Sequence, residues 1–309
     1  GRTNAPDSAR QLLALIGDTS QPAIGRATAI NLLQQQAQPE HLFTLKRQLA
    51  DPDPLVRAAA VSFMDSTDLN TRVDALWLLL DDPVLSVRLE VARVLAPVTR
   101  GRLPEKFKKQ LEPVIAEYIE AQLVSGERPE SHLNLGLLYA SQRRMPEAEG
   151  AYRTALRLDP GFIPAYVNLA DLYRMGGKGA KSLSMLEEGL KRAPESADLH
   201  HALGLARIRT GNRDKALVNL QQAAELDSGN SHYTFVYAVA LNSMDQRDKA
   251  IEVLGIAMDK HPVDPDILIT LIQLNLEAGD KQKAQQLAKK FQKLWPKEQR
   301  IQQLKSVLQ

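Results

Sequence analysis

The sequence predicts an all-α fold, a right-handed α-solenoid of helix pairs with about 19 helices and no sheet. The C-terminal half repeats with a period of 34 residues, and the N-terminal half repeats with a period of 31. Within the units of the C-terminal half, residues such as His132, Leu135, Gly136 and Tyr139 recur at i, i+3, i+4 and i+7, the spacing of one helical face. Aromatic residues are only 5% of the chain, so we expect a core built mainly from Leu, Ala, Val and Ile.

The composition excludes several classes of protein. The 309 residues contain no Cys, which excludes disulfides, thiolate zinc sites, a Cys nucleophile and covalent haem attachment within this chain. Lys and Arg number 39 against 37 Asp and Glu, so no global field attracts nucleic acid. The longest apolar run, Ala75 to Leu80, is too short to span a bilayer. The chain starts at Gly1 with neither Met nor signal peptide, which suggests a piece of a longer protein.

The first elements are three helix pairs over residues 7–97. Ser20-Gln21-Pro22, Asp51-Pro52-Asp53 and Asp82-Pro83-Val84 recur in step, and each combines an N-cap residue with Pro in the first turn. They predict helices over 24–33, 55–64 and 84–95. The motif Asp53-x-x-Val56-Arg57-x-x-Ala60 resembles a HEAT repeat. Arg57 and Arg88 share one column of this repeat, and we expect each to form an ion pair or carbonyl contact between neighbouring repeats.

A junction follows at 98–128. Pro and Gly punctuate residues 97–104, and the apolar pattern after them predicts a degenerate helix pair over 107–111 and 114–123. Val114, Tyr118 and Ala121 keep the 34-residue spacing to the next repeat, so this pair is assigned to the C-terminal side. We expect one continuous solenoid.

Five units then span 129–298 and begin near Pro129, Ile163, Ala197, Ser231 and Pro265. Each has two helices joined by a polar or glycine turn. Small residues such as Gly136 and Ala148 let the paired backbones approach to about 8–10 Å. A proline closes the second helix in most units, since Pro cannot continue a helix.

The residues of these units carry a resemblance. His132, Leu135, Gly136, Tyr139, Ala148, Tyr152, Ala155 and Pro160 together resemble the tetratricopeptide repeat (TPR), with His in place of the usual Trp. The last unit departs from the pattern at Ile272 and Asn275. Residues 299–309 are expected to form a C-terminal capping helix over the last apolar edge.

No constellation for catalysis, metal or cofactor stands out. Gly176-Gly177-Lys178-Gly179 lies where the repeat requires a turn, and no metal-ligand or triad spacing is present. His200 falls in the packing column of His132, and a metal at His201 has only His232 as a further His candidate. We therefore expect a protein that is not an enzyme and needs no cofactor.

A helical-repeat solenoid offers a groove lined by the first helix of each pair, called here the TPR groove. The TPR resemblance implies that Asn134 and Asn168 bind the backbone or terminal carboxylate of a ligand; the alternative is an inter-helix hydrogen bond. A carboxylate clamp also needs Lys or Arg where this chain has Glu130, Asp198 and Ala202, which speaks against it. From the register, we expect a protein or peptide partner to contact Asn134, Leu137, Asn168, Asp171, Arg174, His201, Leu205, Arg209, His232 and Phe235.

Charge is uneven at the C-terminal end. From Gly279 to Gln309 there are eight basic residues against Asp280 and Glu298. This indicates either a solvated outer face or a contact with an anionic surface through Lys281, Lys289, Lys290, Lys293 and Lys297. No aromatic residues interleave these lysines on the polar face, so nucleic acid is not expected.

The sequence thus favours a non-catalytic scaffold for protein binding. As an alternative, HEAT-like units joined to TPR units by the run 128–136 resemble the C-terminal part of bacterial multihaem cytochrome c/TPR proteins. That resemblance implies an accessory docking region of a larger exported, periplasmic redox enzyme, with the haem-binding part upstream of Gly1. A cytoplasmic location is the other possibility, and a spacer without any groove ligand is a third function.

Overall fold

The computed structural model describes residues 8–34, 38–98 and 105–295. Within these ranges the chain forms seventeen α-helices, four short 3-10 segments and no strand, which confirms the predicted all-α fold of helix pairs. One helix replaces the pair predicted at 107–123, and the capping helix predicted at 299–309 lies outside the described residues, which accounts for the difference from about 19. Every helix in the described ranges is too short or too polar to cross a lipid bilayer.

The chain divides into two compact units, Gly1–Asp159 and Pro160–Gln309. The division falls after the first predicted TPR unit. That unit stays with the HEAT-like helices because its Leu138 is buried in their hydrophobic core. The predicted domain limits at 97, 128 and 298 stay predictions.

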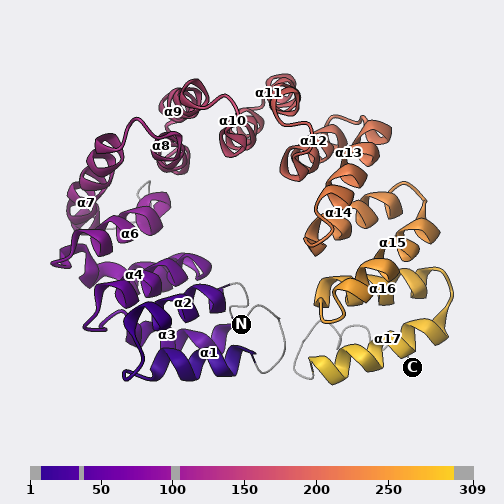
Figure 1. Cartoon of the computed structure of the whole chain (residues 1–309), viewed down its shortest axis with the longest axis horizontal. Coiled ribbons are helices and arrows are strands. Elements are labelled where there is room, and N and C mark those ends of the chain that lie inside the picture. The colour runs from indigo at the N-terminus through magenta and orange to yellow at the C-terminus, as the bar shows by residue number, and fades with distance from the viewer. Residues whose placement is uncertain (1–7, 35–37, 99–104, 296–309) are drawn as a thin grey trace. The chain divides into compact units, whose positions relative to one another are not determined.

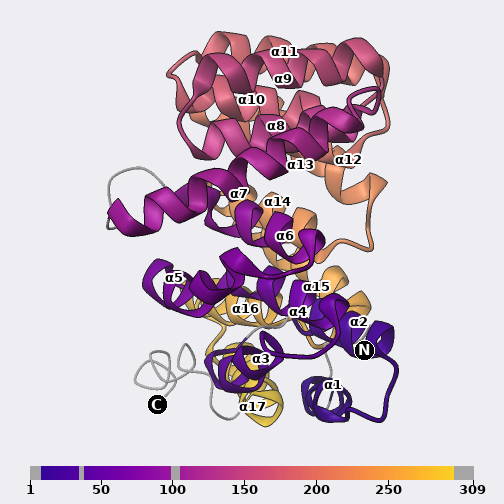
Figure 2. The same cartoon turned by 90° about the vertical axis from the view of Figure 1, so that its left-hand side faces the viewer.

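Six helices form the HEAT-like region: α1 (Ser8–Gly17), α2 (Ala23–Gln34), α3 (Leu42–Gln48), α4 (Pro54–Phe63), α5 (Leu69–Leu76) and α6 (Leu85–Leu95). The three helices predicted from the 31-residue period, α2, α4 and α6, pack side by side in that order (Figures 1 and 2). Asp53 caps α4 by accepting a hydrogen bond from the Leu55 N–H. The recurring Asp51 and Asp82, which the markers predict as caps, instead pair with arginines, and Val84 at the start of α6 makes no side-chain cap bond, so the predicted cap is wrong at these positions.

The arginine column forms a ladder of ion pairs, as expected. Arg57 donates two hydrogen bonds to the Asp82 carboxylate (2.8 and 3.0 Å) and one to the Asp51 backbone carbonyl (2.8 Å). One repeat earlier, Arg26 forms the equivalent ion pair with the Asp51 carboxylate. Burial raises the pKa of the Asp82 carboxyl, and the hydrogen bonds from Arg57 and the Val84 N–H outweigh it, so that pKa lies below its ordinary value. The ladder ends on the next helix, where Arg88 pairs with Glu117 (2.8 Å).

The junction corrects the sequence prediction. Residues 105–124 form a single helix, α7 (Glu105–Val124), which continues through Pro113. Proline disfavours a helix interior by about 3 kcal/mol. However, Leu111, Val114, Ile115 and Tyr118 follow one another at i, i+3, i+4 and i+7 across it, and all four are buried. Burial of this stripe against α6 offsets the cost of the proline, so the expected turn does not form.

Ten helices form the TPR units: α8 (Pro129–Ser141), α9 (Met145–Leu158), α10 (Ile163–Met175), α11 (Gly179–Arg192), α12 (Ala197–Arg209), α13 (Arg213–Leu226), α14 (Ser231–Asn242), α15 (Arg247–Lys260), α16 (Pro265–Glu277) and α17 (Lys281–Leu294). Every first helix begins at the residue that the 34-residue period predicts. Each first helix packs against the second helix of its own pair. In Figure 1, α10 to α17 follow one another as four such pairs in the second unit.

Small residues set the approach of paired helices. A Cβ added to Gly136 would lie 2.3 Å from the Tyr152 ring, and one added to Gly204 would lie 2.7 Å from Leu220. The small residues Ala148, Ala216 and Ala250 of the second helices are fully buried. The predicted role of these columns is therefore confirmed.

The last unit accommodates its departures from the repeat. Ile272 is fully buried, where the other units have Gly or Ala. Asn275 is also buried and donates a hydrogen bond from its side-chain amide to the Leu271 carbonyl (2.7 Å). The polar group is thus satisfied within its own helix.

Candidate functional site

The first helices of the second unit lie next to one another. Helices α10 and α12 contact each other, and so do α14 and α16, while rings of α12 and α14 are in contact. Each of these helices also packs against the second helix of its own pair. Eight of the ten groove residues predicted from the sequence lie on α10, α12 and α14 of this unit. Asn134 and Leu137 lie on α8, in the first unit.

The two asparagines make different contacts. The Asn134 amide donates to Gln122 of α7 (3.0 Å), which is the inter-helix hydrogen bond considered as the alternative to ligand binding. The Asn168 amide donates to the Pro164 carbonyl of its own helix (2.8 Å). Both side chains keep their amide oxygens as acceptors for further contacts.

The groove arginines differ in their surroundings. The Arg174 Nε donates to the Asp171 carboxylate (2.6 Å), and both side chains are about half exposed. Asp171 therefore already neutralises the charge that we expected Arg174 to offer a partner. Arg209, at the end of α12, is exposed and makes no ion pair with the described residues. Arg209 is thus the stronger candidate for pairing with a carboxylate.

An aromatic cluster connects α12 and α14. The His201 ring lies 5.4 Å from the His232 ring and 5.0 Å from the Tyr233 ring, and His232 stacks on Phe235 at 6.4 Å. Burial lowers the pKa of His201 to about 4, and the neighbouring His232 contributes to this shift. His201 is therefore neutral at physiological pH, and its buried Nδ1 has no hydrogen-bond partner in the described residues.

The hydroxyl group of Tyr233, a member of this cluster, donates a hydrogen bond to the Asp198 carboxylate (2.5 Å). Burial raises the pKa of Tyr233, and the hydrogen bond to Asp198 adds to the shift. Asp198 occupies a position where the carboxylate clamp would need a base. Because Asp198 is acidic and already accepts a hydrogen bond from Tyr233, this position does not provide the basic side chain of a carboxylate clamp.

His200 has the packing role predicted from its column. His132, Tyr166 and His200 recur every 34 residues, and each contacts the backbone carbonyl of the residue six positions earlier. His200 also contacts the Asn219 amide (3.0 Å). Among the described residues, no three His, Cys, Asp or Glu side chains are placed to hold a metal ion.

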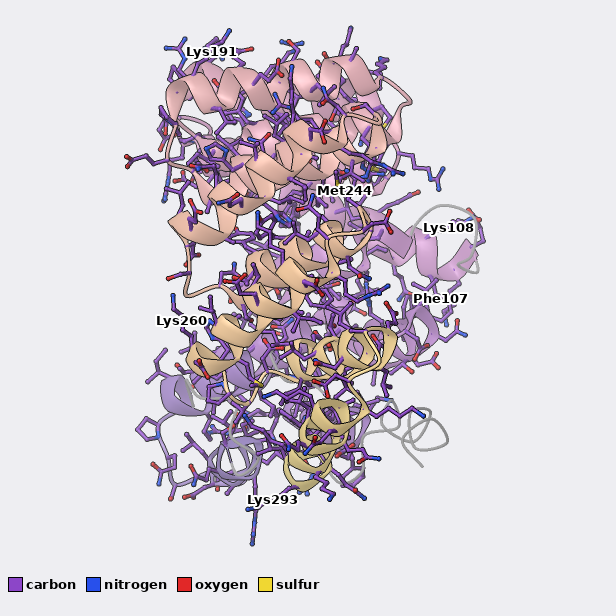
Figure 3. The ribbon with its side chains drawn as sticks, turned by 90° about the vertical axis from the view of Figure 1, so that its right-hand side faces the viewer. Phe107, Lys108, Lys191, Met244, Lys260 and Lys293 are labelled. Atoms are coloured by element: carbon purple, nitrogen blue, oxygen red, sulfur yellow. The ribbon has the colours of Figure 1, made fainter. Side chains whose placement is uncertain are left out.

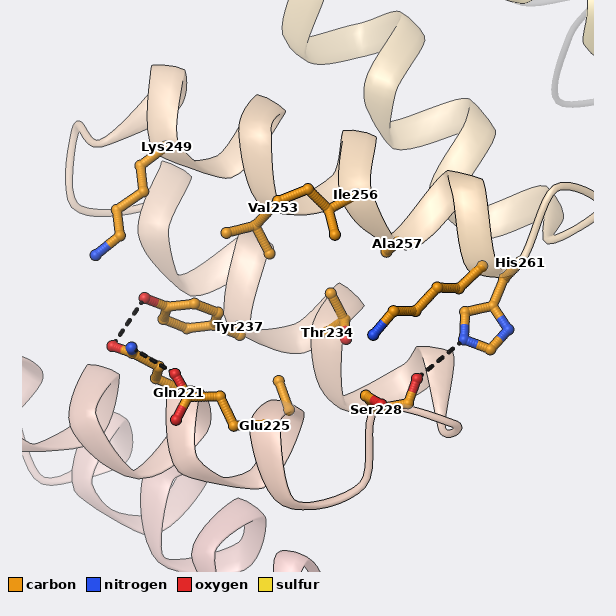
Figure 4. A pocket seen from close by; sticks show the side chains of 12 residues that line it. Gln221, Glu225, Ser228, Thr234, Tyr237, Lys249, Val253, Ile256, Ala257 and His261 are labelled. Carbon is orange, nitrogen blue, oxygen red and sulfur yellow. Dashed lines mark hydrogen bonds between the residues drawn. The ribbon is translucent and has the colours of Figure 1, made fainter.

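The sequence did not reveal a pocket of the second unit, whose lining includes none of the ten predicted groove residues. It has a volume of about 420 Å³ and is formed by α13, α14 and α15 (Figure 4). Its walls are mainly apolar, with Tyr237, Val253, Ile256 and Ala257 among the lining side chains. One signal was present in the sequence, because Ile256 is apolar where the other second-unit repeats have Glu188, Gln222 and Lys290.

The basic residues of the last helix lie on its exposed face. Lys281, Lys283, Lys289, Lys290 and Lys293 are all exposed on α17, and Figure 3 shows Lys293 projecting away from the ribbon. Lys297 lies outside the described residues. Contact with an anionic surface stays a prediction.

Three family models match the chain. A HEAT repeat model matches residues 9–96, and tetratricopeptide repeat models match residues 129–162 and 164–300. Among curated proteins, the human "Protein O-mannosyl-transferase TMTC3" is 22% identical over 68% of this chain and 24% of its own length. The Drosophila melanogaster "BBSome complex member BBS4 homolog" is 28% identical over 50% of this chain and 35% of its own length.

The chain spans well under half the length of either of these relatives. Among solved structures, yeast Tom70 aligns over 100% of this chain and 65% of its own, with a TM-score of 0.58 and 14% identity. This likeness supports the helical-repeat fold. None of the matches described here names a cytochrome, so the resemblance to multihaem cytochromes stays a prediction.

Proposed function

Because the chain is a tetratricopeptide repeat protein with N-terminal HEAT repeats, we propose that it is a non-catalytic scaffold that binds a segment of a partner protein in the TPR groove. The single observation that carries this proposal is the group of His201, His232, Phe235 and Arg209 on α12 and α14. The ring centroids of His201 and His232 lie 5.4 Å apart, and those of His232 and Phe235 lie 6.4 Å apart. The charge of Arg209 acts on His201, and Arg209 is exposed. Aromatic and arginine side chains contribute disproportionately to binding energy at protein interfaces.

The helix framework supports this role. Each ring is held by its own helix and by the helix contacts of the unit, so little side-chain freedom is lost when a partner binds. The apolar area of Phe235 and Leu205 would anchor the segment. The amide of Asn168 and the guanidinium of Arg209 would fix its direction by hydrogen bonds, with Asp171 and Arg174 at the edge of the same face.

The test is affinity capture from native lysate, followed by quantitative mass spectrometry. The parent chain is compared with an Asn168→Ala/Arg174→Ala/Arg209→Ala variant and with a control, Lys191→Ala/Arg192→Ala, at the end of α11. We expect the control to retain the partners of the parent and the groove variant to lose them. Equal capture by all three proteins would refute the groove proposal.

A second candidate keeps this scaffold but places it in a larger protein. In the curated relatives the matched region is a minor part of the whole, which favours an accessory docking region. In the version that the sequence suggests, the larger protein that contains this chain is an exported multihaem cytochrome or another redox enzyme. The coding sequence upstream of Gly1 decides this, because Cys-x-x-Cys-His motifs there would identify the haem-binding part.

A further inference from the structure

The pocket between α13, α14 and α15 lies where the fourth TPR unit departs from the repeat. In the first three units, the column of His132, Tyr166 and His200 places a ring beside the backbone, and each ring contacts the carbonyl six residues earlier. The fourth unit has Thr234 in this column. Thr234 lines the pocket, so the pocket opens where the other units have a ring.

The neighbours of the missing ring confirm this correspondence. In the second TPR unit, which begins at Ile163, the Tyr166 ring lies against Gly189, since a Cβ added to Gly189 would be 3.0 Å from that ring. In the third, His200 contacts Asn219 (3.0 Å). The residues of the fourth unit in these two columns are Ala257 and Val253, and both line the pocket.

The carbonyl that a ring would contact is also present. In the fourth unit it belongs to Ser228, which lines the pocket. His261 approaches this carbonyl through its Nε2 at 3.3 Å, a long hydrogen bond (Figure 4). A carbonyl oxygen has two lone pairs, so Ser228 can accept a second hydrogen bond from a hydroxyl group inside the pocket.

Two further side chains set the character of the pocket. Ile256 is 57% exposed, although the equivalent positions in the neighbouring repeats are polar. Tyr237 stands in a column that is otherwise Leu, and its hydroxyl donates to Gln221 (3.3 Å) while its ring faces the pocket (Figure 4). An exposed apolar side chain beside an aromatic ring favours an apolar or aromatic ligand.

Positive charge lies at the rim. Lys249 lies 6.0 Å from the Tyr237 ring, and Lys260 ends α15 next to His261. Neither lysine forms an ion pair with the residues that the structure describes. The lining carboxylate, Glu225, accepts a hydrogen bond from Gln221 (2.7 Å) and keeps its negative charge. Two lysines against one carboxylate leave the rim with a net positive charge, which favours acidic residues on either side of the ligand's ring.

From these observations we propose that the pocket is a second binding site, distinct from the TPR groove, for a tyrosine side chain within an acidic segment of a partner protein. The ring takes the place that Tyr166 and His200 fill in their own units. Its hydroxyl group donates to the Ser228 carbonyl, as the Tyr166 hydroxyl does to the Pro160 carbonyl at 3.1 Å. Carboxylates next to the tyrosine pair with Lys249 and Lys260.

The probe is an acetylated and amidated pentapeptide, Asp-Glu-Tyr-Glu-Asp, titrated into the ¹⁵N-labelled full chain and followed by NMR. We expect saturable shifts at residues of α13, α14 and α15. The same peptide with Ala in place of Tyr should lose binding, and one with Lys in place of the acidic residues should bind at least tenfold more weakly. No saturable shift at about 1 mM peptide, or equal binding of the Ala peptide, would overturn the proposal.

The decisive variant is Thr234→Tyr, which supplies the ring from the chain itself. It should weaken binding of the pentapeptide at least tenfold while the melting temperature stays equal or rises. The matched control is Val218→Tyr, which adds the same ring at an exposed position of α13 outside the pocket lining and should bind like the parent. Unfolding of Thr234→Tyr, or its unchanged binding, would show that the pocket does not hold a ring.

Two more variants separate this site from the TPR groove. Ile256→Ser alters an exposed apolar side chain of the pocket, and Lys249→Ala/Lys260→Ala removes the rim charges. Each variant should weaken pentapeptide binding about 2- to 30-fold. Arg209→Ala should leave pentapeptide binding unchanged. If Arg209→Ala abolishes it while Ile256→Ser does not, the peptide binds in the groove and the pocket proposal fails.

Discussion

Among single residues, the small side chains between paired helices show how closely the sequence determines the packing. Ala250 is fully buried between α14 and α15, in the column of Ala148 and Ala216. Ala278 directly follows α16, at the turn before α17. The two residues are chemically the same and differ only in what surrounds them.

We therefore expect Ala250→Leu to lower the free energy of unfolding by about 1–3 kcal/mol, because extra methyl groups overpack a close helix contact. Ala278→Leu should change it by less than about 0.5 kcal/mol, since its side chain is at a turn. Urea denaturation of both variants measures the difference. Equal shifts in the two midpoints would contradict the register of the repeat.

A second residue-scale prediction concerns His201, next to His232, Asp198 and Arg209. Its pKa is lowered to about 4 in the fold, whereas an unfolded chain has the ordinary value of 6.5. The unfolded state therefore binds the proton more readily, and the contribution of this residue to stability is lost as the pH falls from about 6.5 towards 4.

We expect the urea midpoint to fall between pH 7.5 and pH 5.0, and the fall to be smaller in His201→Phe, the residue that Phe235 supplies in the same column. Burial also lowers the pKa of His41, so part of the pH dependence should remain. An identical fall in parent and variant would show that His201 does not titrate below its ordinary range.

Within the HEAT-like elements, the arginine ladder joins neighbouring repeats. The Arg57 and Asp82 side chains are only 11% and 4% exposed, so removing one partner leaves a buried, unpaired charge. Arg57→Ala should destabilise the protein by about 3–5 kcal/mol. Arg153→Ala is the matched control, since its pair with Glu149 is exposed and should contribute less than about 1 kcal/mol. Thermal unfolding that shifts equally for both variants would argue against a structural role for the ladder.

Helix α7 allows a test of why a predicted break is absent. Pro113 is exposed and lacks the N–H that would bond to the carbonyl of Lys109. Pro113→Ala should raise the free energy of unfolding by about 1–3 kcal/mol, because it restores this donor without removing buried area. Pro129→Ala, at the start of α8, should bring no such gain, since the first turn needs no donor there. Destabilisation by Pro113→Ala would mean that the ring itself packs in the native state.

For the whole molecule, binding of a partner should depend on the TPR groove of the second unit. An extended segment that crosses three units at about 10 Å each needs about 9 residues at ~3.3 Å per residue. Arg174→Ala combined with Arg209→Ala should weaken its binding by about 1–3 kcal/mol if carboxylates contact these arginines. Most of this loss should come from Arg209, because Arg174 is already paired with Asp171. Circular dichroism should not change, and a partner that binds residues 1–100 alone would contradict the assignment.

The two regular periods made much of the architecture predictable from the sequence. The 34-residue columns predicted the first residue of α8, α10, α12, α14 and α16, and the 31-residue columns predicted α2, α4 and α6 to within a residue. The same columns identified His200 as a packing residue and Arg57 as an ion-pair residue. This succeeded because in a solenoid each repeat packs mainly on its neighbours, so local patterns specify most contacts.

The sequence by itself thus determined the helix pairs, their small-residue contacts and the arginine column. Only the tertiary structure decided that α7 continues through Pro113 and that the ion-pair ladder ends at Glu117. It also decided that Asp171 forms an ion pair with Arg174 and that a pocket opens at Thr234. Each of these depends on which side chains from other turns and helices are adjacent, and on whether the space of an absent ring is filled by neighbouring side chains. Periodicity places residues on faces, but burial and partner distances arise only when the faces meet.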